Sequence, residues 1–379
     1  MTAAAAPAGF SFRYGPRLVC GAGASESLAA ELPPGPVLFV TDAGILGLGL
    51  ARGALAALRK AGHEVAIFAE VEPDPSAATV LSAAEAGRAA GAASVVGFGG
   101  GSPMDVAKLA ACLLGSGESL EAMYGIDRAT GPRLPLLLVP TTAGTGSEAT
   151  PIAIVTVGGA EKQGVVADAL LADAAILDAS LTLGLPRHVT AATGIDAMVH
   201  AIEAYTSARR KNPVSDALAR EALRLLAGHL LHACDTPTNM EAREAMLLGS
   251  HLAGVAFANA PVAAVHALAY PLGGHFHLPH GHANALMLGP VLSHNLEAAG
   301  PLYGELAPIL GATGARGFAD AIVSLCRATG LPLRLRDLGI GQDALAMLAS
   351  DAMRQQRLLV NNPAPVSEAD ALGLYRQAW

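Results

Sequence analysis

The stretch ASVVGFGGGSPMDVAK, residues 93–108, decides the fold class that we expect for this chain. An apolar, strand-like run leads directly into three consecutive glycines, and a helical pattern follows over residues 104–114. Bare amides at the start of a helix bind a pyrophosphate well, because glycines permit a close approach and the helix dipole favours an anion. The stretch therefore predicts a phosphate-binding turn between a strand and a helix; the alternative is an ordinary tight turn.

The sequence on both sides of this stretch shows the same alternation. Strand-like runs cover residues 36–42, 64–71 and 134–142, and helical patterns cover residues 53–61 and 76–91. Continuous apolar strands separated by helices are typical of a parallel sheet with both faces covered. The first half is thus predicted to be an α/β nucleotide-binding domain with a parallel sheet.

Strand signals nearly vanish after LGLP at residues 183–186, and long helical patterns take their place. These patterns cover residues 189–207, 213–234, 240–258, 317–329 and 367–379. The last of them opens with Ser367 and Asp370 in the spacing of a capping box. We predict two domains, a nucleotide-binding α/β domain over residues 1–186 and an all-α catalytic domain over residues 187–379.

Composition and charge exclude several classes of protein. A chain of 379 residues with 52% hydrophobic and 15% charged residues is too long for a small binding module and too apolar to be disordered. Its 24 basic and 32 acidic residues give a net charge of −8 without a long basic run, which argues against a nucleic-acid partner. The N-terminal MTAAAAPAGFSFRYG does not have the pattern of a secretory signal, and the four cysteines form no CxxC pair. A cytoplasmic location is expected.

A long stretch without charged residues extends from Ala245 to Leu296 and at first suggests membrane-spanning segments. Four prolines interrupt it, and it holds seven of the 12 histidines of the chain. Histidines are costly in lipid but useful in a buried active site that excludes water. We therefore interpret the stretch as the interior of a catalytic domain and expect no membrane partner.

Four side chains in or near this stretch are candidates for a metal site. Asp196 and His200, in GIDAMVHAIEAYTS, are spaced i, i+4 and project from one face of a helix. His266 and His280 follow, fourteen residues apart. One carboxylate and three imidazoles suit Fe²⁺ or Zn²⁺, although any one of these histidines taken alone is more often structural.

A second glycine-rich loop, PTTAGTGSEAT at residues 140–150, follows another predicted strand. Hydroxyl and amide groups at the carboxyl end of a parallel strand belong in a ligand crevice. The earlier GAG at Gly21 to Gly23 has Glu26 where a third glycine would fall, so its dinucleotide fingerprint is incomplete. The nucleotide is expected at the two later loops.

The motifs GGGSPMD, PTTAGTGSEAT, GIDAMVHAIEAYTS, the H…PHG pair and the closing NNPAPVSEADALGLYRQAW together resemble one family. Over almost its whole length the chain is similar to the iron-containing (group III) alcohol dehydrogenases of the dehydroquinate synthase-like superfamily. The resemblance implies an NAD-dependent homodimer that uses Fe²⁺, or Zn²⁺, to transfer a hydride to or from a small primary alcohol or aldehyde.

The resemblance also assigns residues. Asp196, His200, His266 and His280 match the metal ligands. The residues that match the cofactor loops, or lie close to the cofactor, are Gly99, Gly100, Gly101, Ser102, Asp105, Thr141, Thr142, Thr145 and Lys162. Asp42 follows the first predicted strand, where the adenosine ribose binds; its carboxylate favours NAD over NADP, unless it is only a turn aspartate.

Departures from the family pattern concern the proton path and the cofactor. Many relatives carry a relay histidine where this chain has Tyr270, and a free phenol, which titrates at about 10, is a poor base at neutral pH. His275 or His277 is therefore a candidate relay. Asp74 stands where relatives often have Asn and alters contacts with the cofactor; Ala364 replaces a common arginine and is peripheral.

Three other functions compete with the alcohol dehydrogenase assignment. Maleylacetate reductases resemble this chain and use a nicotinamide, but typically have Asn in place of Asp196. A lyase resembling dehydroquinate synthase uses Glu as the carboxylate ligand and needs many basic residues, whereas this chain has four lysines. A non-catalytic binding protein has no need of a metal set together with two cofactor loops.

Overall fold

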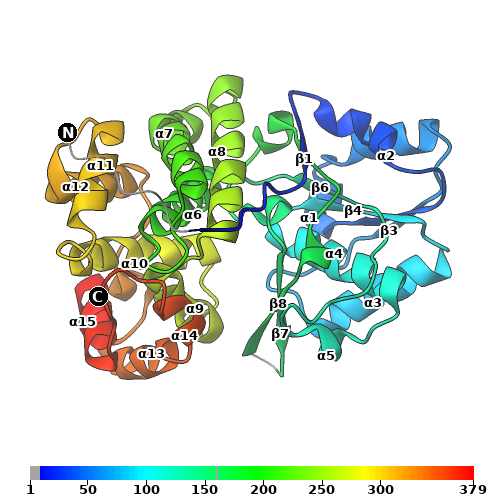
Figure 1. The fold of residues 1–379 in the computed structure, drawn as a ribbon. Coiled ribbons are helices and arrows are strands. Elements are labelled where there is room, and N and C mark those ends of the chain that lie inside the picture. Colours follow the sequence, from blue (N-terminus) through cyan, green and yellow to red (C-terminus); the bar gives the residue numbers. More distant parts are fainter. Residues whose placement is uncertain (1–8, 159–160) are drawn as a thin grey trace. The chain divides into compact units, whose positions relative to one another are not determined.

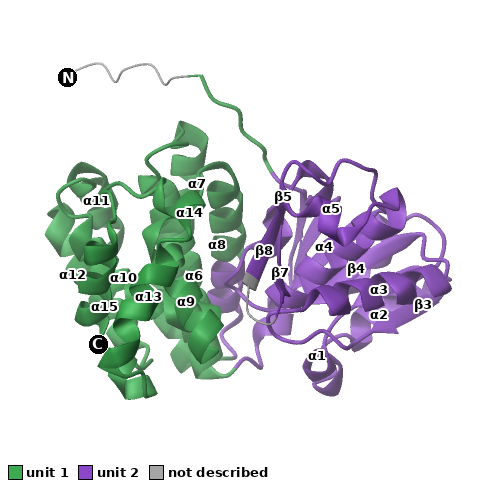
Figure 2. Ribbon diagram, turned by 90° about the horizontal axis from the view of Figure 1, so that it is seen from below, with its two compact units in different colours: residues 1–14, 186–237, 248–379 green, residues 15–185, 238–247 purple. Residues whose placement is uncertain are grey.

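The computed structural model describes residues 9–158 and 161–379. The chain forms two compact units, coloured separately in Figure 2. One unit comprises Gly15–Leu185 and Thr238–Leu247; the other comprises residues 9–14, 186–237 and 248–379. One boundary between the units falls between Leu185 and Pro186. The units are not continuous in sequence, however. Residues 9–14 belong to the helical unit, and residues 238–247 belong to the α/β unit.

A six-stranded parallel sheet forms the centre of the α/β unit (Figure 1). Its strands are β1 (Arg17–Cys20), β2 (Val37–Val40), β3 (Val65–Phe68), β4 (Ser94–Gly99), β6 (Leu136–Pro140) and β9 (Ala174–Leu177). They lie in the order β1-β9-β6-β4-β2-β3, and every neighbouring pair is parallel. The predicted parallel α/β fold is confirmed, although the sequence did not reveal β1 and β9.

Helices cover both faces of this sheet, because successive side chains of a strand point to opposite sides. Val37 and Phe39 of β2 belong to a core shared with η1 (Ala24–Glu31) and α2 (Arg52–Lys60). Leu38 and Val40 belong to a second core shared with α3 (Ala77–Ala89) and α4 (Gly101–Ser116). Burial on both faces explains why the strands form continuous apolar runs in the sequence.

A smaller sheet in the order β5-β8-β7 also belongs to this unit. Its strands β7 (Ile152–Val157) and β8 (Glu161–Val166) are antiparallel, and β5 (Gly125–Ile126) pairs with β8 in parallel. The remaining short elements are α1 (Ala43–Gly47), α5 (Leu120–Met123), η2 (Ser147–Ala149), η3 (Asp168–Leu170) and η4 (Ala179–Thr182).

The strand order of the large sheet reverses between β2 and β4. After β2 the chain forms β3 on one side, and it then returns to form β4 on the other side of β2. Ligands of open α/β sheets bind beside the carboxyl ends of the strands at such a switch point. Asp42 follows β2, and Gly100 follows β4, so the topology brings two of the predicted cofactor segments to this edge.

Helices are the only regular elements in the described part of the second unit. Its helices are α6 (Arg187–Thr206), α7 (Pro213–Asp235), most of α8 (Met240–Asn259), α9 (Ala264–Phe276), α10 (His280–His294), α11 (Gly300–Leu306), η5 (Ala307–Leu310), α12 (Gly314–Ala328), η6 (Leu335–Leu338), η7 (Gln342–Ala344), α13 (Leu345–Ala352), α14 (Gln356–Leu359) and α15 (Glu368–Ala378). The predicted helical second half is confirmed.

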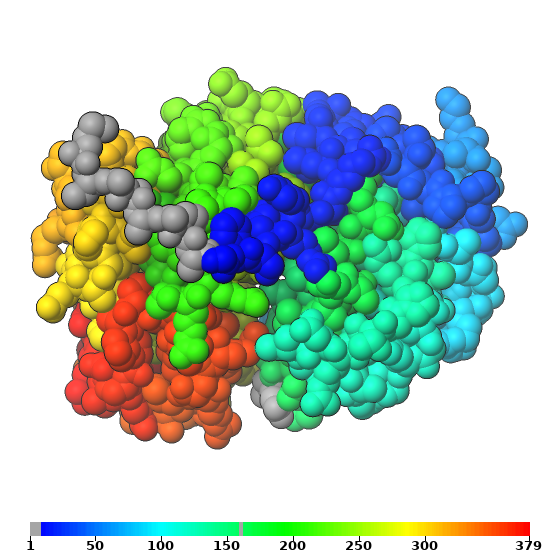
Figure 3. All heavy atoms as spheres, in the orientation of Figure 1, coloured from blue at the N-terminus to red at the C-terminus, as the bar shows by residue number. Residues whose placement is uncertain are grey.

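The closing helices pack together at one end of this unit. α13 and α15 lie side by side and form the orange-red and red surface in Figure 3. α15 begins with the predicted capping box, in which the Ser367 hydroxyl accepts from the Asp370 N–H and the Asp370 carboxylate accepts from the Ser367 N–H.

The long stretch without charged residues raises the question whether a helix of this chain could cross a membrane. Among the described helices, no single one is long and apolar enough to cross a membrane. Two strongly bent helix pairs, α8 with α9 and Gly300–Leu310 with Gly314–Ala328, reach the required length and composition only when their members are joined.

Candidate functional site

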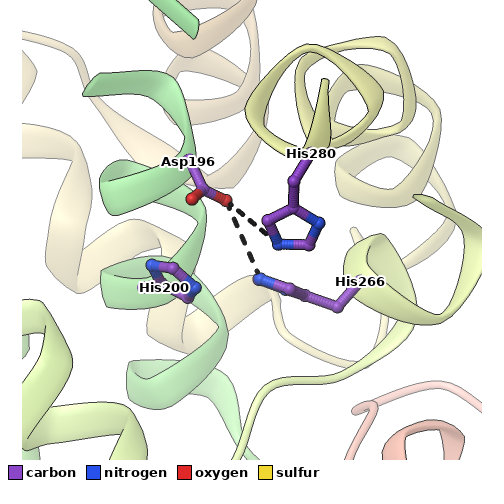
Figure 4. Close-up of side chains that lie close together, drawn as sticks. All are labelled: Asp196, His200, His266 and His280. Atoms are coloured by element: carbon purple, nitrogen blue, oxygen red, sulfur yellow. Dashed lines mark ion pairs between the residues drawn. The ribbon is translucent and has the colours of Figure 1, made fainter. Parts of the chain in front are cut away.

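The four predicted metal ligands come together inside the helical unit, as Figure 4 shows. Asp196 and His200 lie on α6, His266 on α9, and His280 opens α10. One ligand atom from each side chain lies within 4.8 Å of the other three. The Asp196 Oδ1 atom is 3.9 Å from His266 Nε2 and 3.6 Å from His280 Nε2. Ligand atoms around a tetrahedral metal with bonds of about 2.1 Å are roughly 3.4 Å apart, so a small contraction would close the site on an ion.

The side chain of Asn284, one turn after His280, tests whether a cation fits among these atoms. Its amide nitrogen lies 2.5 Å from Asp196 Oδ1, 3.3 Å from His266 Nε2 and 3.2 Å from His280 Nε2. Three acceptor atoms therefore converge on one hydrogen-bond donor, the arrangement that a cation would also satisfy. The amide oxygen of Asn284 is buried and has no hydrogen-bond partner among the described residues. The four ligands fit a divalent metal ion on this evidence.

Burial and charge favour a ligating carboxylate at Asp196. Burial alone acts to raise the pKa of this carboxyl group, but the imidazoles of His200, His280 and His266 and the hydrogen bond from Asn284 outweigh it, so its pKa is lowered. Asp196 is only 1% exposed, whereas the His280 side chain is 41% exposed. The cluster is therefore closed on the Asp196 side and accessible beside His280.

A buried carboxylate that the sequence analysis missed orients His266. Glu203 Oε2 accepts from His266 Nδ1 at 2.7 Å, and its two oxygens also accept from the backbone N–H groups of Ala263 and Val265 at 2.8 and 2.7 Å. An ionised carboxylate is only an acceptor, so the imidazole proton resides on Nδ1. The lone pair of Nε2 then faces the cluster, which is the arrangement that a metal ligand requires.

One signal in the sequence could have indicated Glu203. It lies three residues after His200 and seven after Asp196, so all three side chains share one face of a helix. Its partners, however, lie about sixty residues later at the start of α9, and nothing in the spacing predicted that contact. Asn284, four residues after His280, was missed in the same way.

The three candidate relay residues differ in their surroundings. The Tyr270 ring lies 5.9 Å from the His280 ring, and the guanidinium of Arg357 lies near its hydroxyl. Burial raises the pKa of Tyr270, and the guanidinium of Arg357 opposes this shift without cancelling it. His275 pairs with Asp351. His277 is exposed, in left-handed conformation (φ 53°) at the end of α9. Within the described chain, neither histidine makes a hydrogen bond or ring contact with the four ligands.

As the sequence predicted, three glycines form a turn between strand β4 and helix α4. Gly99 has φ 154°, and a Cβ on it would lie 2.7 Å from Pro103 Cγ, so a larger residue would not fit. α4 starts at Gly101 and has no side-chain cap at its N-terminus, which leaves its first amides available to an anion. Ser102 lies in this first turn.

The second predicted cofactor loop lies directly beside this turn. The Thr141 N–H donates to the Gly99 carbonyl at 2.9 Å. A Cβ on Gly100 would lie 3.6 Å from Thr142 Oγ1, and one on Gly101 would lie 3.0 Å from Thr145 Cγ2. The structure therefore brings the glycines and the three threonines together at the carboxyl ends of β4 and β6.

Asp105 supports this loop from within. Its two oxygens accept from the Ser147 hydroxyl at 2.6 Å and from the Ile154 N–H at 3.0 Å. Lys108, one turn later, is fully buried and donates to Ser147 Oγ and to the Ile152 carbonyl at 2.8 and 2.7 Å. Burial raises the pKa of Asp105 and lowers the pKa of Lys108, while their mutual attraction opposes both shifts. The pair fixes the loop to α4, a role of Lys108 that the sequence analysis missed.

Asp42 caps a helix and also lies at the switch point. Its Oδ1 atom accepts from the Ile45 N–H at 2.9 Å, which caps α1. The turn interpretation and the ribose interpretation are therefore compatible, since capping uses a single oxygen and a carboxylate has further acceptor positions.

Asp74 and Lys162 form an ion pair. Asp74 Oδ1 lies 2.7 Å from Lys162 Nζ, which also donates to Thr156 Oγ1 at 3.0 Å. Asp74 has φ 56°, a left-handed conformation that Asn and Asp adopt more readily than most residues. Asp74, which stands where relatives often have Asn, therefore forms an ion pair with the predicted cofactor residue Lys162.

The GAG loop binds a side chain of the protein itself. The carboxylate of Asp178 accepts from the N–H groups of Gly23 and Ser25 at 3.0 and 3.1 Å, and from the Ser25 hydroxyl at 2.6 Å. These donors lie at the start of η1, where a pyrophosphate would otherwise bind. An internal carboxylate takes that place, which agrees with the incomplete fingerprint.

Comparisons with known proteins agree with this geometry. Residues 15–179 match the family described as iron-containing alcohol dehydrogenase, and residues 190–379 match the C-terminal part of the Fe-containing alcohol dehydrogenase family. The long-chain-alcohol dehydrogenase 1 of Geobacillus thermodenitrificans is 39% identical over 95% of this chain and 94% of its own.

Two solved structures extend the likeness to the fold. The crystal structure of a 1,3-propanediol oxidoreductase has a TM-score of 0.94 and 35% identity, covering 98% of this chain and 100% of the other. That of the sulfoacetaldehyde reductase from Bifidobacterium kashiwanohense in complex with NAD⁺ has a TM-score of 0.89 and 29% identity, covering 98% and 99%.

The parallel sheet, the helical unit and the Asp–His₃ cluster define a metal-dependent oxidoreductase of the dehydroquinate synthase-like fold. Within that class, the chain belongs to the iron-containing alcohol dehydrogenase family. It is an enzyme that interconverts alcohols and carbonyl compounds.

Proposed function

We propose that this protein transfers a hydride between a small primary alcohol, or its aldehyde, and NAD(H), with a divalent metal held by Asp196, His200, His266 and His280. The convergence of these four ligand atoms within 4.8 Å carries the proposal. A bound metal would polarise the substrate oxygen, and the nicotinamide would accept or supply the hydride. The retained carboxylate Asp196 favours this function over a maleylacetate reductase, and the presence of only four lysines argues against a lyase for phosphorylated substrates.

The residues of the chain contribute binding and orientation. Glu203 holds the proton on His266 Nδ1, so that Nε2 can ligate. The first amides of α4, with Gly99 to Ser102 and the hydroxyls of Thr141, Thr142 and Thr145, provide donors for a pyrophosphate. Lys162 lies opposite Thr156 in the β7–β8 pair, and Asp74 contacts both of these residues.

Activity and metal content test the proposal together. Purified protein would be assayed with NAD and with NADP against a panel of primary alcohols and aldehydes, and its metal content would be measured as isolated. We expect NAD-linked turnover that is lost with a chelator and restored by Fe²⁺ or Zn²⁺. Zn²⁺ is included because N and O ligands bind it more tightly than Fe²⁺. Turnover without any metal would contradict the proposal.

The location, oligomeric state and partners of the enzyme can also be proposed. We propose that it acts in the cytoplasm as a homodimer, and that neither nucleic acid nor a membrane is its partner. The net charge of −8 supports the exclusion of nucleic acid, and the family resemblance supports the dimer. Light scattering of the purified protein would give the oligomeric state.

Asp42 is expected to determine the preference for NAD. Asp42→Ser removes the charge but retains an oxygen that can cap α1. We expect the ratio of kcat/KM with NADP to kcat/KM with NAD to rise by about 10-fold or more, because a carboxylate repels the 2′-phosphate of NADP. Kinetics with both cofactors measure this ratio. A wild-type enzyme that already prefers NADP would show that the assignment of Asp42 is wrong.

His277 is expected to relay the alcohol proton. The raised pKa of Tyr270 argues against the phenol as a base, and the pairing of His275 with Asp351 leaves His277 as the remaining candidate. We expect His277→Ala to lower kcat by about 100-fold for a neutral alcohol, and Tyr270→Phe to lower it less. Metal analysis of both variants separates proton transfer from metal loss. If Tyr270→Phe is the inactive variant and retains its metal, the phenol is the relay.

A further inference from the structure

A cationic side chain lies next to the accessible side of the metal cluster. Arg357 belongs to α14, which packs against α9. Its guanidinium is close enough to Tyr270 to act on the pKa of that phenol, and the Tyr270 ring lies 5.9 Å from the ring of His280. His280 is the exposed member of the metal cluster. One aromatic side chain thus separates the guanidinium from a metal ligand.

No carboxylate among the described residues forms an ion pair with Arg357, whereas Arg354, three residues earlier, pairs with Asp351 at 3.5 Å. The stretch from Ala245 to Leu296, which includes α9 and two metal ligands, has no charged residue apart from its histidines. The nearby carboxylates of Asp196 and Glu203 are buried and engaged within the cluster. Arg357 is exposed, so an anion in solution can reach it.

A second guanidinium lies at the same end of α14. Arg209 donates to the carbonyl of Val360 at 3.2 Å, and like Arg357 it pairs with no carboxylate in the described chain. α14 is thus flanked by two guanidiniums without a carboxylate partner in the described chain, although the whole chain carries a net charge of −8.

We infer that the substrate carries an anionic group, a carboxylate or a sulfonate, at the end of its carbon chain remote from the reacting carbon, and that Arg357 binds this group. The inference rests on the proposed alcohol dehydrogenase function and specifies its substrate. A guanidinium matches the planar spacing of such oxygens and binds them through two N–H groups. The Tyr270 hydroxyl lies on the same side of α9 as this guanidinium, and its O–H can donate to the same anion. Tyr270 is thereby assigned a binding role, in place of the relay function of the histidine that it replaces.

Matched substrates test this inference. Metal-loaded enzyme with NADH would be given aldehydes of equal chain length that end in a methyl, a carboxylate or a sulfonate group, for example butanal, 4-oxobutanoate and 3-oxopropane-1-sulfonate. We expect kcat/KM to be at least ~10-fold higher for one of the anionic members than for its neutral partner. The carboxylate and sulfonate arms identify which anion is preferred.

The variant Arg357→Gln should remove this discrimination. We expect the ratio of kcat/KM for the anionic aldehyde to that for the neutral one to fall by about 10- to 100-fold, the range for lost hydrogen bonds to a charged group. The change should appear mainly in KM. Arg354→Gln is the matched control, because this arginine already pairs with Asp351, and its ratio should match that of the wild type.

Direct binding provides a readout that does not depend on turnover. Calorimetry with butanoate, which has no reacting carbonyl carbon, should show binding to the metal-loaded wild type and to Arg354→Gln, and about 10-fold weaker binding or none to Arg357→Gln. A wild type that prefers neutral aldehydes at every length, or butanoate binding that does not depend on Arg357, would overturn the inference. If no aldehyde is reduced but butanoate binding depends on Arg357, the anion site stands and the proposed function fails.

Discussion

Replacing His280 with alanine is expected to empty the metal site and to reduce turnover to background. The substitution removes one of the four proposed ligand atoms, and the loss of a ligand weakens metal binding enough for a chelator to compete for the ion. The fold should persist, because His280 is the most exposed member of the cluster and its removal opens no large internal cavity. Metal analysis and NAD-linked kinetics on the same preparation measure both effects.

His282→Ala is the matched control for that experiment. His282 lies two residues later in α10, and its Nε2 atom bonds to the carbonyl of Pro332 at 2.7 Å instead of facing the cluster. Its replacement should leave metal content at the wild-type level. Unchanged metal occupancy in His280→Ala would refute the ligand assignment.

Glu203→Gln is expected to weaken metal binding without removing any ligand. An amide of the same size still has one acceptor oxygen, but its NH₂ group would face the N–H of Ala263 or Val265, both of which are donors. The proton on His266 Nδ1 is then less firmly held, and the imidazole loses its fixed orientation. Loss of such an outer partner typically lowers metal affinity about 10- to 100-fold.

Chelator competition measures this change in affinity, and the visible absorption of the Co²⁺-substituted protein reports the geometry at the metal. Glu305→Gln serves as the control, since Glu305 accepts from the Tyr205 hydroxyl and makes no contact with the cluster. Equal metal affinity in wild type and Glu203→Gln would mean that Glu203 only anchors the start of α9.

The sequence predicted those parts of the fold that depend on local pattern. The buried runs around Val37 and Val95 identified the central strands, because residues buried on both faces form continuous apolar stretches. Strands β1 and β9 were missed although they are as long as β2 and β3: β1 is an edge strand with mostly exposed residues, and β9 has the sequence AAIL, half of it alanine. Pro271 and Pro290 were interpreted as breaks, yet both lie inside helices. In such cases tertiary packing outweighs local preference.

In the candidate site too, the sequence predicted some residues and missed others. Asp196 and His200 could be paired from spacing alone, because four residues make one helical turn. His266 and His280 were candidates because they lie in the stretch without charged residues, and the family resemblance then matched all four side chains to metal ligands. Glu203, Lys108 and Arg357 were missed because their roles arise from contacts with residues 40 to 90 positions away. No periodicity in the sequence encodes such contacts.

Anomalous X-ray diffraction from crystals of the metal-loaded enzyme, recorded at the iron and zinc absorption edges, tests the central claim most directly. We expect one strong peak within about 2.0–2.2 Å of a carboxylate oxygen of Asp196 and of an imidazole nitrogen of His200, His266 and His280. The same maps should show Asn284 turned away from the position that its amide nitrogen holds among these atoms. A metal peak elsewhere in an active crystal, or an active enzyme without a peak among these four residues, would contradict the account.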